Sequence, residues 1–161
     1  MDGATEQAKA AGFVEANGFT PDGFAGVLQQ MGYRVELLGE KNGGPLLRSA
    51  TGGLVFHVAL SNPAADKTGA YLTARFFAAL QIEGTLPLSV INGWNTSMRF
   101  ARLHVNGGFL LLDMDVLAVG GMPQAQLAAY VQTWDRLVQG LIAYLRDVLP
   151  KMAAGEPVAA E

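Results

Sequence analysis

Residues 98–145 read MRFARLHVNGGFLLLDMDVLAVGGMPQAQLAAYVQTWDRLVQGLIAYL, and this stretch decides the fold that we predict. Asn106 and Gly107 lie between two runs of alternating apolar residues. Both tolerate the positive φ that a two-residue type I′ turn needs at its central positions. We therefore expect a β-hairpin in which Val105 faces Gly108. A slip of one residue would mix the apolar and polar faces, so this register is preferred.

A long amphipathic helix is predicted directly after the hairpin. Gly120 and Gly121 end the second strand, and Pro123 suits the first turn of a helix. Apolar residues then recur at three- and four-residue steps, which is the pattern of one buried helical face. We expect this face to pack across the apolar side of the hairpin, and Pro150 to end the helix. The apolar residues are Leu127, Tyr130, Val131, Trp134, Leu137, Val138, Leu141, Ile142 and Leu145.

Period-two alternation and turn residues predict the other elements. One helix begins at Thr20 and another at Pro87. The predicted strands are Tyr33–Leu38, Leu46–Thr51, Leu54–Leu60 and Tyr71–Leu80. The last of these segments is apolar enough for a helix or a strand, and its Tyr, Thr and Phe content favours a strand. The order is a helix, three or four strands, a helix, two strands and a helix, which is typical of an α+β fold with an antiparallel sheet.

Composition restricts the possible classes of protein. The chain has 161 residues, enough for one domain, and half of them are hydrophobic. Its net charge of −3 and its scattered basic residues argue against nucleic-acid binding. There is no cysteine, no run long and apolar enough to span a membrane and no signal-peptide pattern. We expect a cytoplasmic protein with a flexible arm at 1–19, one domain at 20–150 and a flexible tail at 151–161.

The sheet face away from the long helix mixes charged and large apolar residues. Such a mixture is typical of an interface. The alternative is a partly solvated sheet with cross-strand pairs, such as Arg102 diagonal to Asp113. Alternation places these residues on the face: Arg34, Glu36, His57, Thr73, Arg75, Arg102, His104, Asp113, Asp115, Val55, Phe77, Phe100, Phe109, Leu111 and Leu117. We take as partner-binding candidates Phe77, Phe100, Arg102, His104, Phe109, Leu111 and Asp113.

Catalytic and metal chemistry have weaker support in the sequence. His57, His104 and Asp113 share the predicted face and could ligate a transition metal, but no HExxH or comparable spacing is present. Asp113 and Asp115 could act as paired acid and base, although exposed carboxylates on a strand are commoner. The glycine pairs lie outside phosphate-binding motifs, and no GxSxG is present. We therefore predict no catalytic residue, no metal site and no cofactor.

The middle helix and the hairpin resemble a known family. Leu86-Pro87-Leu88, Ile91-Asn92-Gly93-Trp94-Asn95, Phe109–Asp115 and Gly120-Gly121 are similar to the YbjN family, described as bacterial sensory transduction regulators. The resemblance implies a fold like that of type III secretion chaperones: a five-stranded antiparallel sheet in the order α-β-β-β-α-β-β-α, often dimeric. Asn92, Trp94 and Asn95 would then be structural, because asparagine adopts the left-handed conformation and caps helix ends.

Three hypotheses about function follow. The first is a non-enzymatic, YbjN-like regulatory or protein-binding module in the cytoplasm, dimeric and binding through a sheet face or edge. The second is a chaperone-like holder that adds an extended partner segment to a sheet edge. The third is a metal-dependent enzyme using His57, His104 and Asp113. The expected partners are a second copy of the chain and another protein, with neither nucleic acid nor membrane.

Overall fold

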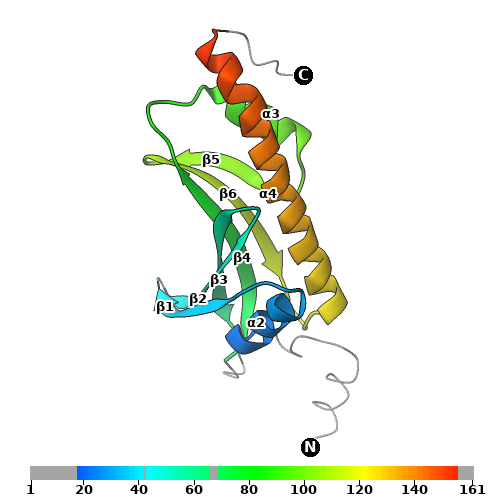
Figure 1. The fold of residues 1–161 in the computed structure, drawn as a ribbon. Helices are drawn as coiled ribbons and strands as arrows, with labels where there is room; N and C mark the ends of the chain where they lie inside the picture. The colour runs from blue at the N-terminus through cyan, green and yellow to red at the C-terminus, as the bar shows by residue number, and fades with distance from the viewer. Residues whose placement is uncertain (1–17, 42, 66–68, 156–161) are drawn as a thin grey trace, which may run out of the picture.

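The computed structural model describes residues 18–41, 43–65 and 69–155. The described elements are three helices and six strands (Figure 1). In chain order they are α2 (Pro21–Gln30), β1 (Glu36–Lys41), β2 (Gly44–Thr51), β3 (Leu54–Pro63), β4 (Tyr71–Gln81), α3 (Leu88–Ser97), β5 (Arg102–Asn106), β6 (Phe109–Leu117) and α4 (Gln124–Ala153). Residues 1–17 of the predicted arm (1–19) and residues 156–161 of the predicted tail (151–161) lie outside the described residues.

All six strands form one antiparallel sheet in the order β1-β2-β3-β4-β6-β5. The α+β class is as predicted, but the five-strand count is wrong. The count of five, which the resemblance implied, is one short, because each of the six segments predicted from alternation forms a strand. The first of them, predicted at Tyr33–Leu38, is β1 at Glu36–Lys41, which pairs with β2 at the edge of the sheet. The segment from Tyr71 is a strand, as its composition indicated.

The β5–β6 hairpin has the predicted faces but a different register. Asn106 pairs with Phe109, so the loop is Gly107-Gly108 and the register is shifted by two residues from the predicted one. Gly107 has φ +59, which suits a tight hairpin turn. Because side chains alternate with a period of two, this shift keeps every side chain on its predicted face while changing its cross-strand partner.

The three helices pack on one face of the sheet, with α4 running along its length (Figure 1). Trp134 of α4 is 1% exposed, and its ring centroid lies 5.9 Å from that of Phe56 and 5.6 Å from that of Phe76. The predicted packing of α4 over the apolar face of the sheet is confirmed. The predicted end at Pro150 is wrong, because α4 continues to Ala153. Proline lacks the backbone N–H and so removes one helical hydrogen bond, but Pro150 lies in the last turn, where the helix can tolerate this loss.

The N-terminal side of the domain begins before the predicted boundary. Phe19 is fully buried and exchanges two backbone hydrogen bonds with Tyr71, each 2.7 Å long. The next residue, Thr20, caps α2 as expected, since its hydroxyl accepts a hydrogen bond from the Gly23 N–H. The described domain therefore includes Phe19 as a core residue.

Candidate functional site

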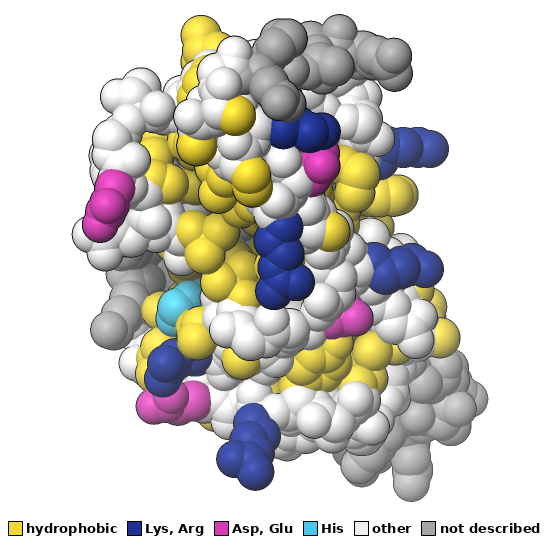
Figure 2. Space-filling model, turned by 45° about the horizontal axis from the view of Figure 1, so that its top comes forward, with side chains coloured by type: hydrophobic (Ala, Val, Ile, Leu, Met, Phe, Trp, Pro, Cys, Tyr) yellow, Lys and Arg dark blue, Asp and Glu magenta, His cyan; other side chains and the backbone are white. Residues whose placement is uncertain are grey.

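A groove of about 710 Å³ lies on the sheet face opposite the helices. Its apolar floor includes Phe77, Leu111 and Ala59, all only partly buried. Charged groups stand among these apolar ones. Figure 2, turned by 45° from the view of Figure 1, shows apolar, basic and acidic side chains interspersed on the surface of the molecule. The charged and titratable residues lining the groove are Arg75, His104, Asp113 and Asp115.

One row of residues on this face crosses the whole sheet. The strand registers align Glu36 (β1), Arg48 (β2), His57 (β3), Phe77 (β4), Asp113 (β6) and Arg102 (β5). Neighbours in this six-strand row interact: the Glu36 and Arg48 side chains lie 3.3 Å apart, and the His57 and Phe77 rings stack with centroids 5.3 Å apart. The row therefore runs from one edge of the sheet to the other, and two of its members, Phe77 and Asp113, line the groove.

Asp113 is the buried charge at the centre of the site. It is 4% exposed, and its carboxylate accepts hydrogen bonds from Arg102 Nε at 2.7 Å and Nη2 at 3.2 Å. Arg75 Nε lies 3.9 Å from the same carboxylate, and His104 Nε2 lies 4.0 Å from it. A buried carboxylate is tolerated only when it is paired in this way. The hydrogen bonds from Arg102, followed by the charge of Asp113, raise the pKa of the Arg102 guanidinium above its ordinary value.

Three arginines on the sheet strands are paired with carboxylates. Arg75 Nε donates a hydrogen bond to Asp115 at 3.2 Å. Arg48, Arg75 and Arg102 therefore each contact a carboxylate on an adjacent strand. His104 retains one buried nitrogen, Nδ1, without a hydrogen-bond partner. The groove is thus lined by apolar side chains and by paired charged groups.

The structure gathers most of the predicted partner-binding residues. Phe77, Arg102, His104, Leu111 and Asp113 lie on three adjacent strands, β4, β6 and β5. Phe109 lies on the same face at the tip of the hairpin and is 47% exposed. Phe100 is separate from this group, because β5 begins only at Arg102 and Phe100 lies beside α4. Arg48 and Arg75 also belong to the open face, although they were not predicted as partner-binding residues. Their ion pairs with carboxylates on adjacent strands depend on the register between the strands, which the sequence did not predict.

The three residues proposed as metal ligands are not brought together. His57 lies on β3, and two strands separate it from His104 on β5. Strands are spaced about 4.8 Å apart, so the two histidines stand about 14 Å from each other across the sheet. In the described part of the chain, no group of three or more His, Asp or Glu side chains is arranged to hold a metal ion. The metal-site hypothesis for His57, His104 and Asp113 is therefore wrong.

Asn95 and Trp94, which the family resemblance singled out, each contact a different element of the fold. The Asn95 side-chain amide donates to the Leu103 carbonyl and accepts from the Leu103 N–H, both at 2.8 Å. It thereby satisfies outward backbone groups of the edge strand β5. Trp94 is 1% exposed and meets Tyr144 edge-on, with ring centroids 5.7 Å apart. Asn92 is exposed on α3, where its carbonyl accepts a hydrogen bond from Thr96 Oγ1.

The fold and the site define an α+β protein with a one-sided antiparallel sheet and a groove on its open face. Residues 20–147 match the model of the YbjN family, described as a putative bacterial sensory transduction regulator, and the chain belongs to that family. Comparisons with curated proteins and with solved structures found no match. Among the helices that the structure describes, none is long and apolar enough to cross a membrane.

Proposed function

We propose that the protein is a regulatory binding module that docks proteins on the open face of its sheet, the first partner being a second copy of itself. The groove between β3 and β5 is the observation that carries this proposal. Partly exposed Phe77 and Leu111 supply apolar contact area there, while paired arginines and carboxylates surround them. Docked surfaces typically combine an apolar centre with a polar rim in this manner.

The open face supports the proposal better than the two sheet edges do. At the β5 edge, Asn95 already bonds the outward backbone groups of Leu103. At the β1 edge, a β-bulge interrupts pairing between Leu37 and Glu40, and Gly39 has φ +75. Bulges and covered backbone groups are the devices that protect edge strands from further pairing. Strand addition, which the chaperone-like alternative requires, would have to displace them.

The charge balance also supports a protein partner. Each of Arg48, Arg75 and Arg102 lies against a carboxylate, so the face offers few free cations to a phosphate backbone. A second copy would meet paired charges around the groove rather than a cluster of charges of one sign. The proposal includes a cytoplasmic location. It also includes no catalytic activity, which agrees with the description of the family as regulators.

Light scattering after size-exclusion chromatography tests self-association. We expect a mass of twice 17.0 kDa for the wild-type chain, falling to 17.0 kDa when Phe77→Thr and Leu111→Thr are combined. Threonine keeps the preference for strands while removing the apolar contact. Val105→Thr is the matched control, because Val105 is 43% exposed on β5 but lies on the other face. Circular dichroism checks that each variant is folded.

Two outcomes would count against the proposal. A wild-type chain that remains at 17.0 kDa across the concentration range would exclude self-association. A double variant that remains dimeric would move the interface away from the groove. If the wild-type chain is monomeric but captures another protein in a pulldown that the double variant fails to capture, the face binds a different partner.

A further inference from the structure

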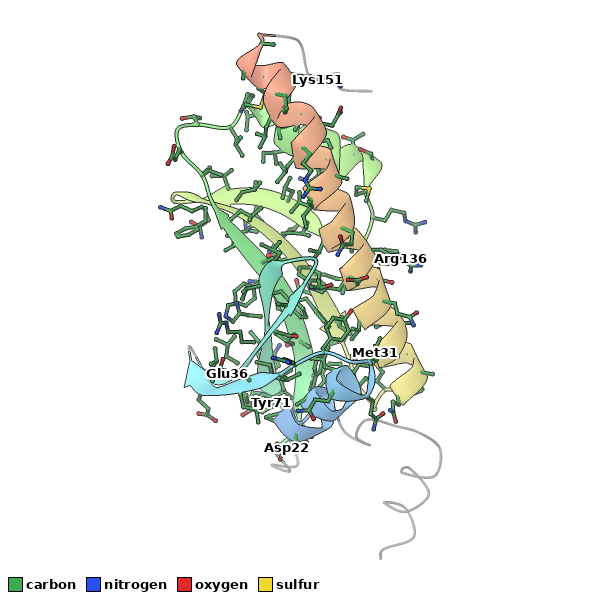
Figure 3. All side chains as sticks on the ribbon, viewed as in Figure 1. Asp22, Met31, Glu36, Tyr71, Arg136 and Lys151 are labelled. Carbon is green, nitrogen blue, oxygen red and sulfur yellow. The ribbon has the colours of Figure 1, made fainter. Side chains whose placement is uncertain are left out.

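A second surface, at the corner between α3 and β5, carries features that the open sheet face does not explain. Ser97, Arg99 and Phe100 form one wall of a hollow of about 330 Å³, and Thr133 and Arg136 of α4 form the other. Figure 3 shows Arg136 on α4 and Glu36 on β1 at opposite sides of the molecule. This corner is therefore separate from the six-strand row.

Phe100 is held in a strained and exposed position. Its φ is +73, and the Ala101 N–H donates to the Arg99 carbonyl at 3.0 Å, so Phe100 is the central residue of a γ-turn with positive φ. This type of turn is rare and strained, and a bulky side chain increases its cost. The Phe100 side chain nevertheless remains 66% exposed, so burial of the ring does not offset the energetic cost of the turn. Strain maintained at an exposed aromatic residue indicates a binding role.

Two arginines beside Phe100 lack a carboxylate partner. The Arg99 guanidinium carbon lies 5.6 Å from the Phe100 ring centroid, and Arg136 contacts Thr133 Oγ1 only at 3.4 Å. Neither arginine forms an ion pair with another described residue, whereas Arg48, Arg75 and Arg102 on the sheet all do. The corner is thus locally positive on a chain whose net charge is −3.

We propose that this corner binds an acidic segment of a protein partner, with a carboxylate between Arg99 and Arg136 and an apolar side chain against Phe100. Guanidinium groups bind carboxylates through paired, charge-assisted hydrogen bonds. Most residues that line the hollow are exposed, so it cannot enclose a small molecule as typical ligand pockets do. Two arginines are also too few for a phosphate backbone.

Nuclear magnetic resonance of the full ¹⁵N-labelled chain tests the proposal. The probe is the acetylated, amidated peptide EEWEE, with QQWQQ as its uncharged counterpart. We expect saturable amide shifts at residues 97–100 and 133–137 with EEWEE, weakened by added salt, and much smaller shifts with QQWQQ. Arg136→Gln and Phe100→Gly should each weaken binding about tenfold. Arg146→Gln removes the same charge from α4 outside the hollow and should leave binding unchanged.

The result can overturn the proposal in several ways. Absence of saturable shifts, shifts centred on the open sheet face, or equal binding of QQWQQ would each do so. An effect of Arg146→Gln equal to that of Arg136→Gln would reduce the binding to general charge attraction. None of these outcomes bears on self-association through the groove, which the Phe77 and Leu111 variants test separately.

Discussion

Arg102 and Asp113 face each other directly across the β5–β6 hairpin and are joined by two hydrogen bonds of 2.7 and 3.2 Å. The carboxylate side chain is 5% exposed, whereas the arginine side chain is 60% exposed. An exposed guanidinium thus covers a buried carboxylate and allows a charge to remain in the open face of the sheet. The stability of the site should therefore depend on Arg102 more than on the other arginines of the sheet.

Replacing Arg102 with Gln should lower the free energy of unfolding by about 1 kcal/mol, because the buried carboxylate loses its main donor. The expected loss is small for a buried carboxylate because Arg75 and His104 remain near Asp113. Urea denaturation measures it. Arg48→Gln is the matched control at the other end of the six-strand row: its pair with Glu36 is exposed, so the change should cost less than about 0.5 kcal/mol. Equal losses would contradict the special position of Asp113.

Asn95→Ala should expose the edge of β5. The variant loses both hydrogen bonds to Leu103, and we expect stability to fall by about 1 kcal/mol, since water can partly replace them. The uncovered backbone groups should also increase aggregation, measured by light scattering during storage. Asn92→Ala, an exposed change on the same helix, should alter stability by less than about 0.5 kcal/mol. Equal behaviour of the two variants would remove the edge-protecting role of Asn95.

Stability should fall in alkaline solution because of two tyrosines. Burial, together with the charge of Asp135, raises the pKa of the Tyr33 hydroxyl above 10.0, and burial raises that of Tyr144. Below about pH 10 both hydroxyls are protonated in the folded and the unfolded chain. Above that value the unfolded chain loses its protons first, so the free energy of unfolding decreases until the folded-state pKa is passed. Denaturation between about pH 8 and 11 measures the slope.

The double variant Tyr33→Phe with Tyr144→Phe should reduce this alkaline slope. Tyr144→Phe also removes the 2.6 Å hydrogen bond from its hydroxyl to the Val90 carbonyl, so the variant should already be less stable at pH 7. The slope, rather than the absolute stability, is therefore the relevant measurement. An unchanged slope would assign the alkaline loss to other groups.

Glycine and alanine at position 100 should have the opposite of their usual order of stability. At an ordinary exposed site, alanine is more stabilising than glycine by about 0.5–1 kcal/mol. At φ +73, glycine is free of the steric cost that alanine retains, so Phe100→Gly should be more stable than Phe100→Ala by about 1 kcal/mol. Thermal unfolding of the two variants checks this order. A more stable alanine variant would show that the γ-turn at Phe100 is not strained.

The sequence predicted which face each strand residue occupies, because alternation depends only on local geometry. It did not predict register, since a shift of two residues leaves the faces unchanged. For that reason Arg102 was placed diagonal to Asp113 instead of opposite it, and the contacts of Arg75 and Arg48 were missed. The strand count was wrong because it followed the family resemblance, whereas alternation along the chain marks six segments, all of which are strands.

Phe100 and Asn95 illustrate a second limit. Alternation placed Phe100 on the open face, but a γ-turn interrupts the strand pattern, and phenylalanine gives no signal of positive φ. Asn95 was expected to be structural through helix capping, whereas its amide reaches a strand eight residues later. Contacts between elements of this kind depend on how α3 packs beside β5, which local propensity does not determine.

Distances between spin labels on two copies can show whether the copies meet through their open sheet faces. The chain has no cysteine, so a single label can be attached after Ala79→Cys or Ala143→Cys. Ala79 is exposed on the open face opposite Leu111, and Ala143 is exposed on α4. We expect dipolar coupling between two copies, with a shorter distance for the label at position 79 than for that at position 143. Absence of coupling at both positions, or a shorter distance at position 143, would show that the copies do not meet through their open sheet faces.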